Sequence, residues 1–233
     1  MTHDTERSNK DERRIEILDA AERVFLERGI AAATMEQIAR KAGVSKGGLY
    51  KYFETKDELF LSIAKRALDD LNSRLARVQA EQRGSSGLEW VHASLDAYFD
   101  YAKTCPDRFR VALSWISAEY SVAHDTVMFR GYREALARAF DFGYTALELG
   151  KQDGSVRPDL DTESTLLHMW GATTGVLMLL FNQDEVRRRL PFEADFDEML
   201  RENSRMLMAV IKNPDAFLTD APLRVVGGGP EGE

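Results

Sequence analysis

The sequence is poor in the residues that build covalent, metal or catalytic sites. Its one cysteine, Cys105, cannot form an intrachain disulfide, which fits a reducing compartment. The four histidines show no metal-ligand spacing such as H-x-x-x-H, and no nucleophile stands beside a base in a recurring catalytic arrangement. Gly227–Gly229 lacks the Lys-Ser/Thr that follows a phosphate-binding loop. We therefore expect no metal, no cofactor and no enzymatic activity.

Long apolar runs are also missing. The longest, residues 166–181, has 16 residues, whereas a membrane-spanning helix needs about 20. The N-terminal stretch MTHDTERSNKDERR has no apolar centre of the kind found in a signal peptide. These features predict a cytoplasmic protein that does not enter a membrane. Polar residues 1–10 are predicted to be a disordered arm, and residues 216–233 a flexible, glycine-rich tail.

No segment alternates apolar and polar residues as a strand does, whereas apolar residues recur at helical spacing from residue 11 to residue 212. The predicted class is therefore all-α. We expect a DNA-binding domain at residues 11–55 and a larger helical domain for ligand binding and dimerisation at residues 56–215. Helices are predicted to begin near residues 13, 35, 46, 56, 88, 107, 127, 162 and 195.

Residues 34–56, TMEQIARKAGVSKGGLYKYFETK, contain three helix starts within a short stretch. Thr34 with Gln37 and Thr55 with Glu58 have the T-x-x-Q/E spacing of a capping box, and Ser45 can cap the helix between them. Gly43 suits the left-handed position that ends a helix. Two short helices joined by a tight turn are the arrangement that places one helix in the major groove of DNA.

The second of these helices, predicted to run from Lys46 to about Phe53, has an unusual composition. It carries two lysines, two tyrosines and the pair Gly47-Gly48. Each glycine in a helix is unfavourable by about 0.8–1 kcal/mol relative to alanine. Close approach of the backbone to a phosphate chain is a reason to keep them, and a loose turn is the alternative.

This segment resembles the N-terminal domain of the TetR (tetracycline-repressor-like) transcriptional regulators. Their typical pattern, T-x-x-x-I-A-x-x-A-G-V-S-x-G-x-x-Y-x-x-F-x-x-K-x-x-L, is matched in register from Thr34 to Leu59. The resemblance covers residues 11–60 and is highly specific, whereas beyond residue 60 it concerns architecture alone.

The resemblance implies two kinds of DNA contact. Phosphate contacts are expected from Thr34, Tyr50, Tyr52 and Lys56, and base or backbone contacts from Ser45, Lys46, Gly47, Gly48 and Lys51. The chain departs from the common pattern twice, with tyrosine at position 52 where histidine is frequent and glycine at position 48 where threonine is frequent. The second departure removes a methyl and a hydroxyl group that could read a base.

The net charge of −8, taken alone, argues against binding to nucleic acid, but the charge is unevenly distributed along the chain. Residues 40–56 hold five basic residues and one acid, which gives a local charge of +4. A basic patch on an acidic body can orient a protein on DNA. A solvated charged face remains the alternative for Arg40 and Lys41.

Aromatic residues of the middle helices predict a cavity for a small aromatic or lipophilic effector. Each of them alone is more often a core residue than a ligand contact. The candidate lining, with polar anchors included, is Tyr98, Tyr101, Trp115, Tyr132, Phe140, His168, Trp170 and Thr174.

The last two predicted helices are candidates for a homodimer interface, with monomer core as the alternative. A two-fold pair is expected because one small recognition helix reads too few bases for adequate specificity. The candidate interface residues are Gly171, Gly175, Met199, Asn203, Met206 and Val210.

Together these observations predict a homodimeric regulator of transcription, most simply a repressor. It would bind double-stranded DNA at a palindromic operator and leave it when a small-molecule effector binds. The alternatives are an activator, a regulator without a small ligand, and a helical carrier or enzyme whose helix-turn-helix is vestigial.

Overall fold

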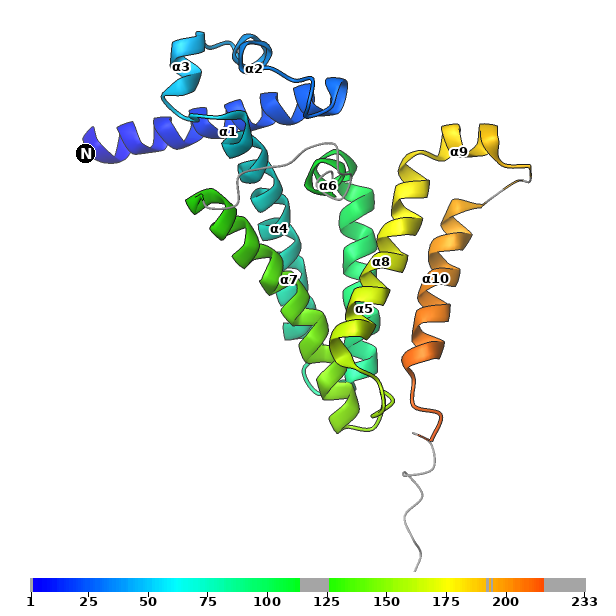
Figure 1. The fold of residues 1–233 in the computed structure, drawn as a ribbon. Coiled ribbons are helices and arrows are strands. Elements are labelled where there is room, and N and C mark those ends of the chain that lie inside the picture. Colours follow the sequence, from blue (N-terminus) through cyan, green and yellow to red (C-terminus); the bar gives the residue numbers. More distant parts are fainter. Residues whose placement is uncertain (1, 114–125, 192, 194, 216–233) are drawn as a thin grey trace, which may run out of the picture.

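The computed structural model describes residues 2–113, 126–191, 193 and 195–215, and these form an all-helical protein (Figure 1). Within these residues the β-structure is limited to one isolated bridge between Val156 and Lys212. The predicted class is confirmed. The helices are α1 (Thr2–Arg28), α2 (Met35–Lys41), α3 (Lys46–Tyr50), α4 (Lys56–Glu81), α5 (Gly87–Thr104), α6 (Pro106–Leu113), α7 (Val127–Gln152), α8 (Thr162–Phe181), α9 (Gln183–Arg189) and α10 (Phe196–Ile211).

Three predicted helix boundaries differ from the structure. The segment 1–10 was expected to be disordered, but it is helical from Thr2. Helix α1 therefore extends towards the N-terminus well beyond its apolar part. The helix expected to reach Phe53 ends at Tyr50. The amides of Lys51 and Tyr52 donate hydrogen bonds to the carbonyls three residues earlier, in place of the four-residue spacing of an α-helix. The connection before Pro191 contains α9, a seven-residue helix without a side-chain cap.

The N-terminal helices form a cap that lies across one end of the longer helices (Figure 1). Its core joins α1 to α2 and α3 through fully buried Ile17, Ile38 and Leu49. The core continues into the first turns of α4, from Leu59 to Ala64. The boundary predicted at residue 55 therefore cuts through this core.

The body consists of α4, α5, α7, α8 and α10, with α6 at its junction with the cap (Figure 1). The start of α5 and the end of α7 touch backbone to backbone. The amide of Gly87 donates to Asp153 at 2.7 Å, and a Cβ atom built on Gly87 would lie 2.0 Å from the nitrogen of Gly150. This approach fixes the end of the body that lies far from the cap.

Candidate nucleic-acid interface and effector cavity

Local capping positions the two short helices as the sequence predicts. The hydroxyl of Thr34 accepts the amide of Gln37 at 3.3 Å, and the Gln37 side chain accepts the Thr34 amide at 3.0 Å. Ser45 accepts the amide of Gly48 at 3.0 Å, and Gly43 has φ of 66°. Only half of the second predicted capping box forms: Thr55 accepts the amide of Glu58, but the Glu58 side chain accepts the amide of Glu54 in place of that of Thr55.

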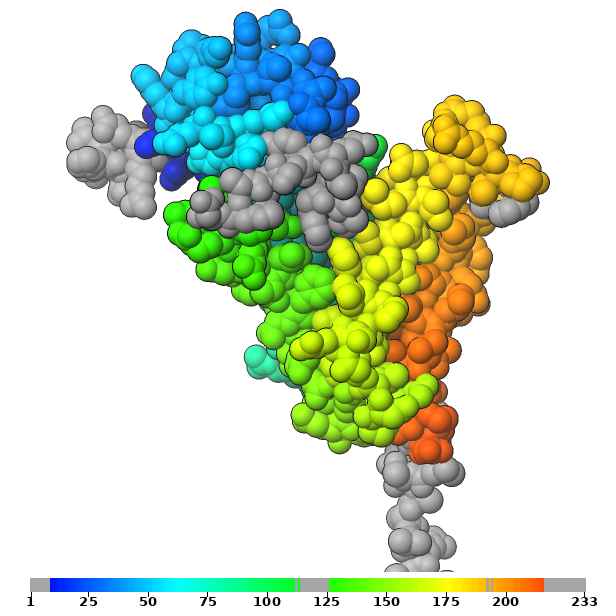
Figure 2. All heavy atoms as spheres, viewed as in Figure 1, coloured from blue at the N-terminus to red at the C-terminus, as the bar shows by residue number. Residues whose placement is uncertain are grey.

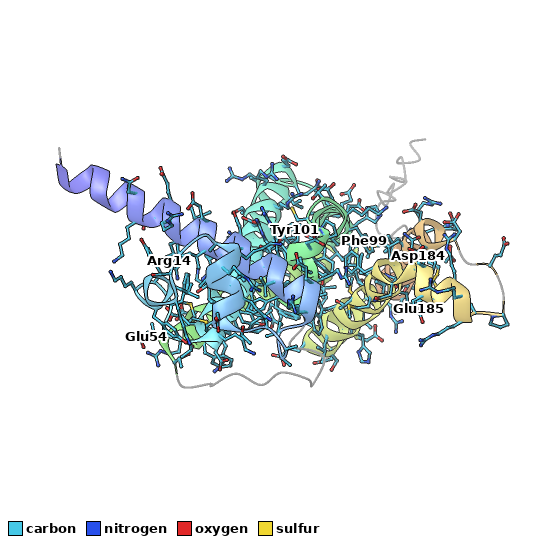
Figure 3. All side chains as sticks on the ribbon, turned by 90° about the horizontal axis from the view of Figure 1, so that it is seen from above. Arg14, Glu54, Phe99, Tyr101, Asp184 and Glu185 are labelled. Atoms are coloured by element: carbon cyan, nitrogen blue, oxygen red, sulfur yellow. The ribbon has the colours of Figure 1, made fainter. Side chains whose placement is uncertain are left out.

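The predicted DNA-contacting residues gather on the outer side of the cap. Six are exposed, namely Thr34, Ser45, Lys46, Gly47, Tyr50 and Lys51, while Gly48, Tyr52 and Lys56 are half-buried. Within the described part of the chain, neither Lys46 nor Lys51 has an ion-pair partner, whereas Lys41 is paired with Glu27 at 2.7 Å. Seen from above, Figure 3 shows Arg14 and Glu54 in this unit and α9, with Asp184 and Glu185, at the opposite end of the molecule.

Lys56 has a different place from the one expected of a phosphate contact. Its ammonium group donates to the carbonyl oxygens of Ile30, Ala31 and Ala33 at 2.8, 2.9 and 3.1 Å. These carbonyls follow the end of α1, so Lys56 ties the start of α4 to the loop before α2. This geometry supports a structural role for Lys56, and sequence spacing alone did not reveal it.

Replacing Lys56 by alanine is expected to lower the free energy of unfolding by about 2 kcal/mol, because three carbonyls lose a charged donor. Thermal or urea unfolding measures the loss. Lys51→Ala, which removes the same charge from an exposed position, should leave stability unchanged. Unchanged stability of the Lys56 variant, together with weaker salt dependence of DNA binding, would instead support the predicted role of Lys56 as a phosphate contact.

Below the cap, the body contains a cavity of about 140 Å³ between α4, α5, α6, α7 and α8. Five of the predicted residues line it: Tyr98, Tyr101, Tyr132, Phe140 and Trp170. Trp115 lies outside the described residues. His168 is exposed, with Nδ1 2.7 Å from the Ser164 carbonyl, and is no part of the lining.

Some of the polar groups at the cavity are engaged within the chain. Thr174 lies behind the lining, where its hydroxyl is 3.1 Å from that of Tyr98. Thr173, which the sequence analysis missed, lines the cavity and accepts from Asn203. Burial raises the pKa of Tyr98 to about 12 against the opposing hydrogen bonds of Thr174 and Trp170, and burial raises the pKa of Tyr132 to about 12. Both phenols therefore stay neutral at physiological pH.

Helix α6 contributes residues both to the core of the cap and to the lining of the cavity. Phe109 and Leu113, one helical turn apart, line the cavity. Val111 packs into the core of the cap together with residues of α1 and α4. Helix α6 therefore connects the cavity wall at Phe109 and Leu113 to residues that pack against α1.

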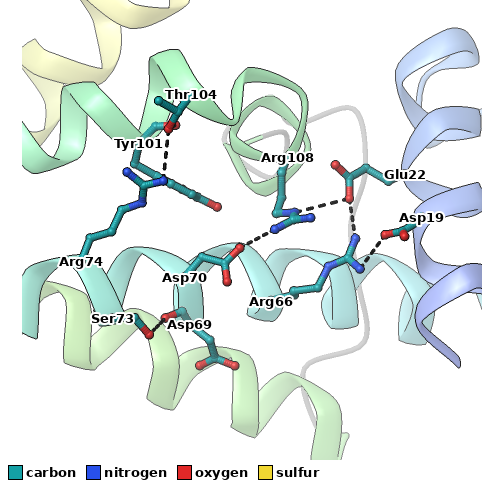
Figure 4. Close-up of polar contacts among 10 residues, drawn as sticks. All are labelled: Asp19, Glu22, Arg66, Asp69, Asp70, Ser73, Arg74, Tyr101, Thr104 and Arg108. Carbon is teal, nitrogen blue, oxygen red and sulfur yellow. Dashed lines mark hydrogen bonds and ion pairs between the residues drawn. The ribbon is translucent and has the colours of Figure 1, made fainter. Parts of the chain in front are cut away.

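An ion-pair cluster reinforces this junction (Figure 4). Arg66 of α4 donates to Asp19 at 2.7 Å and to Glu22 at 2.6 Å, both on α1. Arg108 of α6 lies 3.6 Å from the same Glu22 carboxylate and pairs with Asp70 of α4. Burial lowers the pKa of Arg108, but Glu22 and Asp70 outweigh it and raise the pKa above its usual value. Three helices thus meet at one carboxylate.

The outer face of α8 and α10 is apolar and uncovered in the single chain. Gly171 and Gly175 would meet no atom within 4 Å if they carried a Cβ, and Met206 and Val210 are 61% and 59% exposed. Met199 and Asn203 are half-buried, and Asn203 faces inward to Thr173. Figure 2 shows α8 and α10 side by side along one side of the surface.

Among the described helices, α8 alone is long and apolar enough to cross a membrane, as judged by length and composition. That test is weak evidence, because core helices of soluble proteins also pass it. Helix α8 is longer than the apolar run 166–181, because it begins four residues earlier, at Thr162.

Comparison with known proteins agrees with this architecture. Residues 17–63 match the family described as bacterial regulatory proteins, tetR family. The HTH-type transcriptional repressor KstR2 of Rhodococcus jostii (strain RHA1) is 33% identical over 158 residues, which cover 67% of this chain and 74% of KstR2.

Two further proteins are similar. The HTH-type transcriptional activator FasR of Mycolicibacterium smegmatis is 38% identical over 102 residues, 44% of this chain and 46% of FasR, so the match spans less than half of that relative. The fold of FadR from Bacillus subtilis, solved in complex with stearoyl-CoA, superposes with a TM-score of 0.65 at 18% identity, covering 84% of this chain and 97% of FadR. The chain belongs to the tetR family of bacterial regulatory proteins.

Proposed function

We propose that the protein is a homodimeric, cytoplasmic repressor that binds a palindromic operator through α3 and releases it when an effector fills the cavity. The observation that carries this proposal is the outer side of α3, where Lys46 and Lys51 are exposed without ion-pair partners among the described residues. A short capped helix with such a face fits the major groove. Repression is favoured over activation because KstR2, which this chain matches over more of its length than FasR, is a repressor.

The glycine pair of α3 supports contact with a partner outside the chain. Neither Gly47 nor Gly48 has a positive φ, so their backbone does not require glycine. A Cβ on Gly47 would meet nothing within 4 Å, and one on Gly48 would lie 3.1 Å from the Ser45 hydroxyl. The absence of a side chain at Gly47 therefore has no cause inside the described chain, and it would let a phosphate backbone approach closely.

A second copy of the chain is the occupant that we assign to the face of α8 and α10. Exposed apolar residues and two glycines on one face allow close helix packing, and a two-fold pair would present two α3 helices to successive major grooves.

Release of DNA would pass through α6. An effector that displaces Phe109 or Leu113 also displaces Val111 and Arg108, which contact the cap. The effector must bind the released state more tightly than the DNA-bound state, and a 100- to 1000-fold release requires about 3–4 kcal/mol of coupling.

Selection of bound sequences from a random DNA library with the purified protein tests the proposal. Enrichment of an inverted repeat is expected for a dimer with two reading helices. Salt-sensitive binding without any enriched sequence would contradict sequence-specific regulation.

Lys51→Ala should weaken DNA binding at every sequence if Lys51 contacts phosphate. The slope of log affinity against log salt concentration is expected to fall by about 0.9 per subunit, because one fewer counterion is released. A salt titration by fluorescence anisotropy measures it. Lys103→Ala removes the same charge from a lysine paired with Asp197 in the body, and it should leave the slope unchanged.

A further inference from the structure

The cavity is lined almost entirely by apolar and aromatic side chains. Among the described residues, none of the 21 that line it is a carboxylate, a lysine, an arginine or a histidine. A carboxylate placed there would lose its hydration without gaining a charged partner, at a cost of several kcal/mol. The lining thus selects a neutral molecule.

The lining includes a serine hydroxyl that has no partner among the described residues. The Oγ atom of Ser94, on α5, is buried and makes no hydrogen bond to the described residues. A helical serine ordinarily satisfies itself by donating to the carbonyl of the preceding turn, so an unbonded, buried hydroxyl at a cavity wall is costly.

Two other hydroxyls at the cavity are engaged within the chain. Tyr98 is engaged by Thr174, and Thr173 accepts from Asn203. The hydroxyl of Tyr101 is also buried without a partner, but its ring lies under the Arg74 guanidinium, 5.2 Å away. Figure 4 shows the hydroxyl end of Tyr101 directed towards Arg108 and Asp70, on the side of the ion-pair cluster.

We infer that the effector is a compact neutral molecule with an apolar body and a single hydrogen-bonding group that pairs with Ser94. This inference rests on the cavity being the effector site. The size of the space agrees with it, since an engineered apolar cavity of about 150 Å³ accepts benzene. A volume of about 140 Å³ therefore holds one aromatic ring with a small substituent and is too small for an 18-carbon acyl chain.

Three probes with the same aromatic ring test whether the ligand needs a polar group and whether that group can be charged. Toluene carries no polar group, p-cresol carries a hydroxyl and p-toluate carries a carboxylate. Binding is measured without DNA, by calorimetry and by tryptophan fluorescence, to which Trp170 at the cavity contributes. We expect p-cresol to bind about 3- to 10-fold more tightly than toluene, and p-toluate not to bind.

Ser94→Ala should reduce the affinity for p-cresol to that for toluene and leave the affinity for toluene unchanged. Ala139→Leu, which places a larger side chain in the cavity, should abolish binding of both. Binding of p-toluate as tight as that of p-cresol, an unchanged p-cresol affinity in Ser94→Ala, or binding that survives Ala139→Leu would each overturn the inference. Because these readouts involve no DNA, a separate failure of p-cresol to release operator DNA would count against the proposed regulation and not against the chemistry of the cavity.

Discussion

Replacing Gly87 by alanine is expected to destabilise the protein by about 3 kcal/mol or more, although the change adds one methyl group. The added Cβ would lie 2.0 Å from the nitrogen and 2.3 Å from the Cα of Gly150, and 2.6 Å from the carbonyl oxygen of Ala146. All three atoms belong to the backbone of α7, so no side-chain rotation can relieve the clash. The first turn of α5 would have to separate from the last turns of α7.

The separation would also break polar contacts. The amide of Gly87 would lose Asp153, and the amide of Leu88 would lose the Ser155 hydroxyl at 3.1 Å. In a chain of this length the expected decrease in Tm is about 10 °C. Calorimetry or circular dichroism of the purified variant measures it.

Gly131→Ala is the matched control, because Gly131 also lies in a helix of the body. There the new Cβ would meet the flexible end of Lys65 at 3.6 Å, which is an ordinary contact. This variant should be as stable as the parent or more stable by up to about 0.8 kcal/mol, because alanine favours the helix. Equal stability of the two variants would show that the helices do not approach as described.

Gly175→Glu is expected to convert the protein to monomers at micromolar concentration and to weaken operator binding by more than about 100-fold. In the single chain the new side chain projects into open space, so folding should be unaffected. In a two-fold dimer it would bring two like charges into an apolar interface, which disfavours association strongly.

Sedimentation velocity measures the oligomeric state, and circular dichroism checks the fold. Ala76→Glu is the control, since Ala76 is exposed on α4, away from the face of α8 and α10. This control should remain dimeric. A Gly175→Glu protein that stays dimeric would show that this face of α8 does not form the dimer interface.

Features governed by neighbouring residues could be predicted from the sequence. The Thr34–Gln37 capping box, the left-handed Gly43 and the Ser45 cap depend on contacts within a few positions, and all three occur as expected. The set of cavity aromatics was partly predictable, because large rings in several amphipathic helices of a single body tend to meet in its interior.

Features that depend on distant parts of the chain could not be predicted. Lys56 reaches carbonyls more than twenty positions earlier, and Gly87 touches Gly150 across the body. Ser94 was overlooked because its signal is the absence of a partner, which is visible only when its surroundings are known. The anchor expected at His168 failed because successive residues of a helix point in directions about 100° apart, so exposed His168 directly precedes Met169, which lines the cavity.

The sharing of α6 between cap and cavity also bears on how the protein unfolds and evolves. Val111 and Tyr132, from the body, complete the core of the cap, so the cap on its own would expose apolar surface that is buried in the whole chain. A single cooperative unfolding transition is the natural outcome of such a shared core. A chimera that carries the cap of a relative would therefore need matching side chains at positions 111 and 132, although neither is a predicted DNA contact.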